Sequence, residues 1–164
     1  MKYSWLIVYC SVILILTKVS FAQSIPIVTW KQIHQNVLNS QNDTIYVINF
    51  WATWCKPCIE ELPAFVKLHD SSGLPVKVVF ASMDFKKDLL TKLQPFVQKR
   101  NIKADVVLVS EPDQEKFINS VSQDWSGSLP ATIILNTKKN IRLFYERQFT
   151  YSELVDIINN LIYK

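Results

Sequence analysis

One stretch constrains the fold more than any other, an apolar strand that leads through two cysteines into a helix. Residues 44–51 (TIYVINFW) are β-branched and aromatic almost throughout, which predicts a strand buried on both faces. Cys55 and Cys58 follow, separated by two residues, and a helix is predicted over residues 58–70 with Gly73 ending it. A strand that turns directly into a helix indicates an α/β architecture.

The rest of the chain continues this alternation of strands and helices. The apolar spacing predicts helices over residues 29–39, 86–100 and 112–121 and a last helix after Thr150, and strands over residues 76–83, 104–110, 131–135 and 141–149. The sheet should be mixed and covered by helices on both faces, which gives three layers. Its last two strands should be antiparallel, because only a short loop joins them.

Several residues refine these boundaries. Pro63 should kink its helix, Pro95 should interrupt the one around it, and Pro112 should lie near a first helical turn. Thr150 and Glu153 have the spacing of a capping box. The long interval before residue 131 leaves room for one further strand and helix.

The first 22 residues have the layout of a secretory signal peptide. Lys2 precedes an apolar run of 12 residues, 5–16, and the small residues Ser20 and Ala22 precede a cleavage site before Gln23. The alternative is an uncleaved membrane anchor, but a bilayer needs about 20 apolar residues. We therefore predict a signal peptide over 1–22, a single domain over 23–164, and a periplasmic location.

Charge and cysteine content limit the function of the mature chain. Removing Lys2 and Lys18 from 18 basic residues leaves 16 against 14 acidic ones, a net charge of +2. This charge is too small to indicate a nucleic-acid partner. Cys10 is removed with the leader, so Cys55 and Cys58 remain in a compartment that is expected to be oxidising.

Three kinds of site are compatible with a CxxC motif. A structural zinc site needs four ligands, whereas His34 and His69 are isolated from each other and from the cysteines in the sequence. A structural disulfide across so short a loop would remove little entropy from the unfolded chain. The third kind, a redox-active dithiol, is the one that CxxC beside a βαβ pattern favours.

The position of Cys55 at the start of a helix supports the redox interpretation. Free N–H groups and the positive end of the helix dipole should lower its pKa and favour a thiolate. A shift of about two units corresponds to about 2.7 kcal/mol. The dipole alone supplies about 0.3–2 kcal/mol, so hydrogen bonds to the sulfur, from the thiol or the N–H of Cys58, should add the rest.

The segments FWATWCKPCIEELP and SLPATIIL resemble the thioredoxin superfamily, and more closely the exported TlpA/ResA-like thiol–disulfide oxidoreductases. The resemblance implies a thioredoxin fold with a strand and helix inserted before a cis-proline at Pro130. It makes Cys55 the nucleophile and Cys58 the resolving thiol. Trp54, Leu129 and Pro130 would shape a groove for an extended substrate segment.

One position departs from plain thioredoxin, which carries a buried Asp six residues before the first cysteine. Asn49, which cannot titrate, stands there in this chain. The resemblance to the exported subfamily implies that Glu61 replaces it as acid/base. On a helix, Glu61 and Cys58 share one face. The alternative is that Glu61 is an ordinary exposed acid like Glu60.

We therefore expect an exported enzyme that exchanges its dithiol with protein disulfides, without a metal or organic cofactor. We expect a membrane-bound electron donor as a further partner, and we expect no nucleic-acid partner. Two other functions stay open. The first is a peroxiredoxin-like peroxide reductase, which would have Thr where Ala52 stands. The second is a non-catalytic thioredoxin-fold binding module that serves as a scaffold or carries copper, and the two isolated histidines argue against copper.

Overall fold

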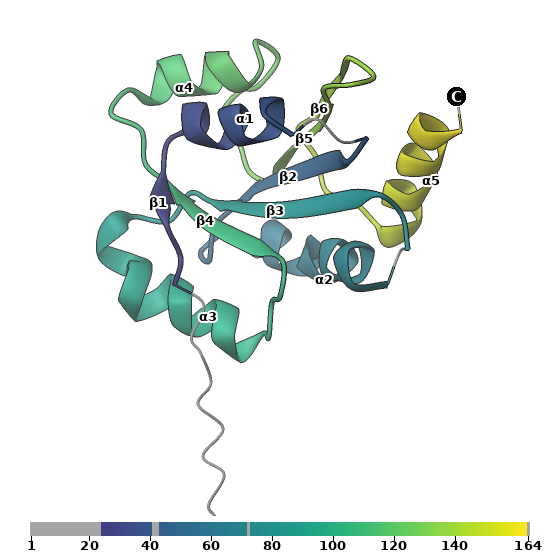
Figure 1. The fold of residues 1–164 in the computed structure, drawn as a ribbon. Helices are drawn as coiled ribbons and strands as arrows, with labels where there is room; N and C mark the ends of the chain where they lie inside the picture. The colour runs from purple at the N-terminus through teal and green to yellow at the C-terminus, as the bar shows by residue number, and fades with distance from the viewer. Residues whose placement is uncertain (1–23, 41–42, 72, 164) are drawn as a thin grey trace, which may run out of the picture.

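The protein is described by a computed structural model that covers residues 24–40, 43–71 and 73–163 (Figure 1). The predicted signal peptide lies outside these residues. Within the part of the chain that the structure describes, no helix is long and apolar enough to cross a membrane.

A six-stranded mixed sheet forms the centre of the molecule. Its strands are β1 (Ile27–Val28), β2 (Ile45–Trp51), β3 (Val76–Ser82), β4 (Asp105–Val109), β5 (Ala131–Asn136) and β6 (Ile141–Tyr145). They are arranged in the order β1-β4-β3-β2-β5-β6. The pairs β1–β4, β4–β3 and β3–β2 are parallel, whereas β5 is antiparallel to both β2 and β6. The mixed sheet and its final antiparallel pair are as predicted.

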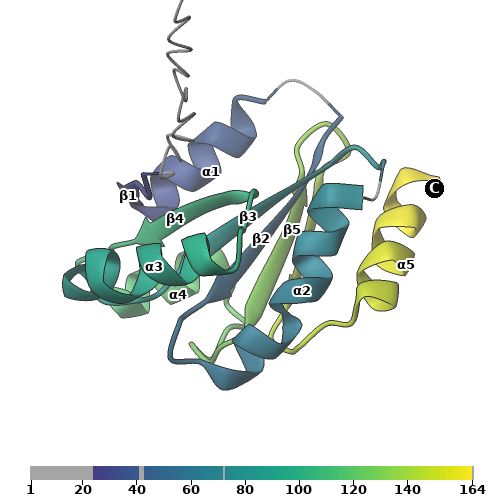
Figure 2. The same cartoon turned by 90° about the horizontal axis from the view of Figure 1, so that it is seen from below.

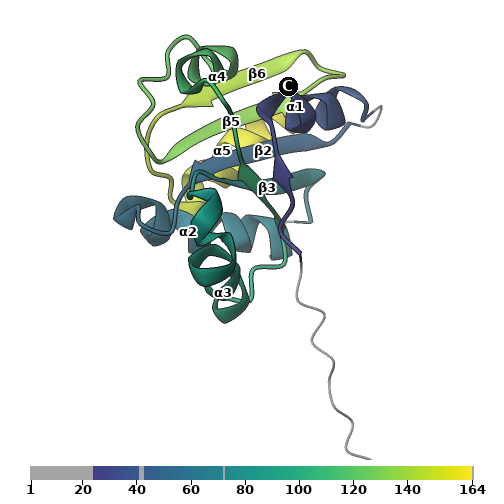
Figure 3. The ribbon, with the colours of Figure 1, turned by 90° about the vertical axis from the view of Figure 1, so that its left-hand side faces the viewer.

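Helices cover both faces of this sheet. One face carries α1 (Trp30–Leu38) and α4 (Gln114–Val121), and the other carries α2 (Lys56–Ser71), α3 (Gln94–Lys99) and α5 (Tyr151–Ile162). Figure 2 shows α2, α3 and α5 in front of the sheet, and Figure 3 shows the sheet between the two helix layers. The predicted three-layer α/β fold is confirmed.

Each face of the sheet has its own hydrophobic core. On β2, Val47 and Trp51 pack with Leu62 and Phe65 of α2, whereas the neighbouring Phe50 packs on the opposite face. That second core is rich in aromatic rings from α1, α4 and the loop after α4: Trp30, Phe117 and Trp125. Because β2 is buried on both faces, apolar side chains occupy nearly every position in it and show no alternation, Asn49 being the buried polar exception.

The inserted strand and helix are β4 and α4. β4 lies between β1 and β3, parallel to both, and α4 follows it before the chain enters β5. This is the insertion that the resemblance to the exported subfamily implied. It places the β4–α4 connection at the same edge of the sheet as the start of α2, because the carboxyl ends of parallel strands share one edge (Figure 1).

The observed boundaries correct several predictions. α2 begins at Lys56, two residues earlier than predicted, and ends before Gly73, whose φ of 60° favours a helix stop. β1 was not predicted, because two residues are too few to show a period. β6 ends at Tyr145, which leaves residues 146–149 outside the strand.

The segment predicted as a helix over 86–100 is not uniform. It consists of a 3-10 turn η1 (Lys86–Asp88), a π-helical turn η2 (Leu89–Leu93) and then α3. Pro95 has no N–H and its ring would clash with a carbonyl one turn earlier in a regular α-helix. The wider turn directly before Pro95 avoids this clash, so the predicted interruption is present. Pro112 directly precedes Asp113, the N-cap of α4, and so lies near the first turn as predicted.

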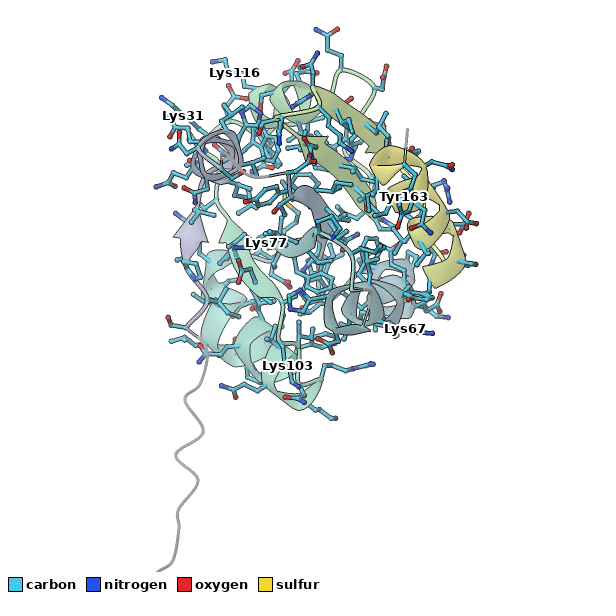
Figure 4. The ribbon with its side chains drawn as sticks, turned by 45° about the vertical axis from the view of Figure 1, so that its right-hand side comes forward. Lys31, Lys67, Lys77, Lys103, Lys116 and Tyr163 are labelled. Carbon is cyan, nitrogen blue, oxygen red and sulfur yellow. A yellow bond between two sulfur atoms is a disulfide. The ribbon has the colours of Figure 1, made fainter. Side chains whose placement is uncertain are left out.

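The basic side chains are spread over the surface. Figure 4 shows Lys31 on α1, Lys67 on α2, Lys77 on β3, Lys116 on α4 and Lys103 in the loop between α3 and β4, pointing in different directions.

Candidate active site at the start of helix α2

The CxxC motif lies where β2 ends and α2 begins. The N–H of Cys55 donates to the carbonyl of Ala52 at 3.1 Å, which closes a tight turn after the strand. The carbonyl of Cys55 accepts from the N–H of Ile59 at 3.1 Å, so the first turn of the helix starts on Cys55. Pro57 fits this turn, because the N–H groups there have no partner within a helix. The predicted location of Cys55 at a helix N-terminus is confirmed.

Cys55 and Cys58 are joined by a disulfide, with their Cα atoms 5.3 Å apart. Both are buried, but Cys55 keeps 6% of its surface exposed whereas Cys58 keeps none. The N–H of Cys58 donates to Sγ of Cys55 at 3.3 Å. This is one of the hydrogen bonds that we expected to favour a thiolate at Cys55.

A cavity of about 850 Å³ opens beside Cys55. Trp54 and Phe85, 59% and 62% exposed, contribute large apolar surfaces to it, and Leu129 lines it from the loop before β5. The inserted β4–α4 segment supplies another part of the lining with Val109, Ser110, Glu111, Gln114 and Ile118. The structure thus brings Trp54 and Leu129 together with Cys55, while Pro130 is buried and is not one of the lining residues.

The peptide bond between Leu129 and Pro130 is cis, as predicted. Glu146 lies just after β6. Its carboxylate stabilises the loop that precedes this cis bond by accepting hydrogen bonds from the N–H of Ser126 at 2.9 Å and the N–H of Ser128 at 3.2 Å. Burial raises the pKa of Glu146, but the hydrogen bonds from the two serines outweigh it and leave the pKa below its ordinary value. The position of the loop therefore depends on an ionised side chain from the neighbouring strand end.

Glu61 lies one turn after Cys58 and is buried, with 3% of its surface exposed. One carboxyl oxygen accepts from Nδ2 of Asn49 at 2.8 Å and the other from the N–H of Phe149 at 2.8 Å. Burial raises the pKa of Glu61 to about 7, although both hydrogen bonds and the charge of Arg147 lower it. A carboxyl group that titrates near neutral pH is suited to proton transfer.

The surroundings of Glu61 differ from those of an ordinary surface acid. Glu60, its neighbour in the chain, is exposed and lies 3.9 Å from the ammonium of Lys56. Asn49 connects Glu61 to β5, because its Nδ2 also donates to Oγ1 of Thr132 at 3.1 Å. Phe149 and Thr132 were not recognised in the sequence as part of the site, and nothing in their local pattern indicates it.

The two histidines lie apart from the cysteines. His34 stacks on Trp30 in α1, with ring centroids 5.4 Å apart, and burial together with the charge of Arg142 lowers its pKa. His69 lies in the last turn of α2. Among the residues that the structure describes, no three His, Cys, Asp or Glu side chains form a group that could hold a metal ion.

A mixed sheet with this strand order and a CxxC at the start of α2 defines a thioredoxin-type fold with a redox-type dithiol. Residues 23–144 match the AhpC/TSA family, and the chain belongs to that family.

Two curated relatives from Bacillus subtilis (strain 168) are similar in sequence. Thioredoxin-like protein YneN is 28% identical over 66% of this chain, and Sporulation thiol-disulfide oxidoreductase A is 25% identical over 58%. The chain spans only 59% and 54% of their respective lengths. A solved thioredoxin-related protein from Neisseria meningitidis serogroup B, 21% identical, has the same fold. The match covers 76% of this chain and 90% of the other, with a TM-score of 0.64.

Proposed function

We propose that the protein is an exported thiol–disulfide oxidoreductase whose Cys55–Cys58 pair exchanges electrons with disulfides of other proteins. The observation that carries this proposal is the unequal access to the two sulfurs. Cys55 lines the large cavity and begins the helix, whereas Cys58 is fully buried behind the first turn. A nucleophile must reach its substrate, and a resolving thiol needs only to reach the nucleophile.

In the reducing direction, the thiolate of Cys55 attacks one sulfur of a substrate disulfide. A bond between the two proteins forms, the substrate S–S bond breaks, and the departing sulfur takes a proton from water. Cys58 then loses its proton to Glu61 and attacks the sulfur of Cys55. The internal disulfide forms, the second substrate sulfur leaves and is protonated, and two electrons have passed to the substrate.

The cycle continues when an electron donor reduces the internal disulfide by the same exchange. We assign this role to a membrane-bound dithiol protein; no metal or organic cofactor is required, because the dithiol carries both electrons. The reverse steps oxidise a substrate dithiol. A reduction potential near about −270 mV would favour reduction of substrates, and one near about −120 mV would favour their oxidation.

The cavity is the proposed binding site for the substrate segment that carries the disulfide. Trp54 and Leu129 offer apolar surface in the same cavity as Cys55. Pro130 would act from behind this surface by fixing the course of the loop. The position of Cys55 in the wall of this cavity supports the assignment.

Trapping of the mixed disulfide tests the proposal. Cys58→Ser removes the second attack, so covalent adducts through Cys55 should accumulate on non-reducing gels and disappear with dithiothreitol. Cys55→Ser should trap few partners, because Cys58 has no exposed surface. Equal trapping by both variants, or none by either, would refute the assignment of Cys55 as the nucleophile. Mass spectrometry of the trapped proteins would identify the substrates.

The match to the AhpC/TSA family makes peroxide reduction a second candidate. A peroxiredoxin-like site would have Thr three residues before its cysteine, and Ala52 stands there. Ala52 is fully buried and has no hydroxyl to offer a peroxide. Consumption of hydrogen peroxide by the reduced protein, compared with its rate of disulfide reduction, distinguishes the two activities.

A further inference from the structure

Asp84 is a buried carboxylate in the wall of the same cavity as Cys55. It follows β3 directly, is 5% exposed, and receives three hydrogen bonds through its side-chain oxygens. Two come from Thr53, whose N–H donates at 3.0 Å and whose hydroxyl donates at 2.5 Å, and one comes from the hydroxyl of Ser82 at 2.8 Å. Three donors directed at two oxygens fit an ionised carboxylate, which can only accept.

These bonds extend the pairing of β2 and β3 beyond the end of the sheet. Backbone pairing includes the bond from the N–H of Met83 to the carbonyl of Trp51, at 2.7 Å. Two residues after Trp51, beyond the end of β2, the N–H of Thr53 donates to the side chain of Asp84, which takes the place of a backbone acceptor. Thr53 lies two residues before Cys55, so Asp84 holds the turn that carries the nucleophile.

Asp84 also brings a buried negative charge to the cavity that Cys55 lines. Its three donors are uncharged, and none of the ion pairs found among the described residues includes it. The ammonium groups of Lys56 and Lys86 belong to exposed residues of the same cavity, where water screens them. A buried negative charge disfavours a thiolate nearby and so destabilises the reduced state of the pair.

We propose that Asp84 is a positioning residue that fixes the Thr53–Cys55 turn and, through its charge, makes the Cys55–Cys58 pair a stronger reductant. The inference deepens the proposed function and rests on it for its biological meaning. Its two effects are separable. The turn geometry governs how fast Cys55 reacts, and the charge governs the equilibrium between dithiol and disulfide.

The charge is tested with Asp84→Asn, which keeps the shape and removes the charge. Equilibration of the purified protein with dithiothreitol, two thiols exchanging for one disulfide, gives the equilibrium constant without any natural substrate. We expect a tenfold shift toward the reduced protein, about 30 mV. Asp88→Asn is the matched control, because Asp88 is also buried in this segment but is paired with Lys92 at 3.2 Å. Equal potentials for the two variants would overturn the charge effect.

The positioning is tested with a pair of variants at Thr53. Thr53→Val removes the hydroxyl that bonds Asp84, and Thr53→Ser keeps it. The rate of attack of reduced protein on a small disulfide reagent should fall about fivefold in Thr53→Val and recover in Thr53→Ser, while the potential stays unchanged in both. Equal rates would overturn the positioning role, and this pair tests that role even if Asp84→Asn does not fold. Failure of the mixed-disulfide trapping would instead refute the proposed function, since neither measurement here uses a protein substrate.

Discussion

Glu61 is a carboxyl group whose surroundings oppose its ionisation. Burial raises its pKa to about 7, and Asn49 and Phe149 each donate one hydrogen bond to it. A neutral donor such as Asn49 stabilises the carboxylate less than a cation would. The result is an acid that gains and loses its proton in the pH range in which Cys58 must do the same.

We expect Glu61→Gln to slow the release of substrate from the mixed disulfide by about 10²-fold, the lower end of the usual effect of a general base. Because only the ionised carboxylate can accept the proton of Cys58, the wild-type rate should rise with pH through about 7. The variant should lack this rise. Stopped-flow measurement of the second step gives both quantities, and Glu60→Gln is the control with near wild-type behaviour. Similar small effects at both positions would make Glu61 a structural acid only.

The same group should make stability depend on pH. The folded state holds the Glu61 proton between the ordinary pKa of 4.5 and about 7, whereas the unfolded chain releases it. The free energy of unfolding should therefore fall as pH rises through this window, by about 3 kcal/mol in total. Urea unfolding of the oxidised protein from pH 4.5 to 8 measures this slope. Glu61→Gln should flatten it and Glu60→Gln should not.

At the scale of elements, the loop from α4 to β5 connects the inserted segment to the active site. Gly127 has a φ of 92°, and a Cβ there would lie 2.9 Å from Cδ1 of Ile118 in α4. Both residues line the cavity. Because glycine has no Cβ, the loop can pack closely against α4 and still place Leu129 in the cavity. Glycine at position 127 is therefore required by packing as well as by backbone conformation.

Gly127→Ala should therefore destabilise the protein more than Gly73→Ala. Both have positive φ, which costs an L-residue roughly 1–2 kcal/mol. A Cβ on Gly73 would meet nothing within 4 Å, so only the variant at Gly127 must also displace Ile118. Thermal and urea unfolding compare the two. The rate of attack by Cys55 should fall in Gly127→Ala alone, and equal losses of stability would contradict the role of the Ile118 contact.

At the scale of the whole molecule, two cores on opposite faces of one sheet support a site at the sheet's edge. The core beneath α2 holds Cys55 and Cys58 among apolar side chains, and the aromatic core beneath α4 supports the loop before Pro130. The cavity lies where these two halves meet.

The location of this molecule should be decided by the segment before residue 23. We expect the mature chain to begin at Gln23, because Ser20 and Ala22 provide the small side chains that a signal peptidase requires. Mass spectrometry of the protein isolated from its native host measures the N-terminus. A chain that retains Met1 and sediments with membranes would instead indicate an anchor.

The sequence by itself determined the order of the principal elements and the identity of the dithiol. Apolar runs and helical spacing are local patterns, so the strands from β2 onward, α1, α2 and the capping box of α5 were predictable within a few residues. Recognising the CxxC at a strand–helix junction requires only four neighbouring residues and the start of one helix. These features are also local in the sequence.

Only the tertiary structure decided the surroundings of that dithiol. The contacts of Glu61 reach 12 residues back to Asn49 and 88 residues forward to Phe149, and Asp84 meets Thr53 across 31 residues. Such pairs depend on the register between strands and on where β6 ends, neither of which leaves a periodic trace in the sequence. The burial that raises the pKa of Glu61 is likewise a property of the packed molecule, because α2, β2 and the segment after β6 must come together before water is excluded.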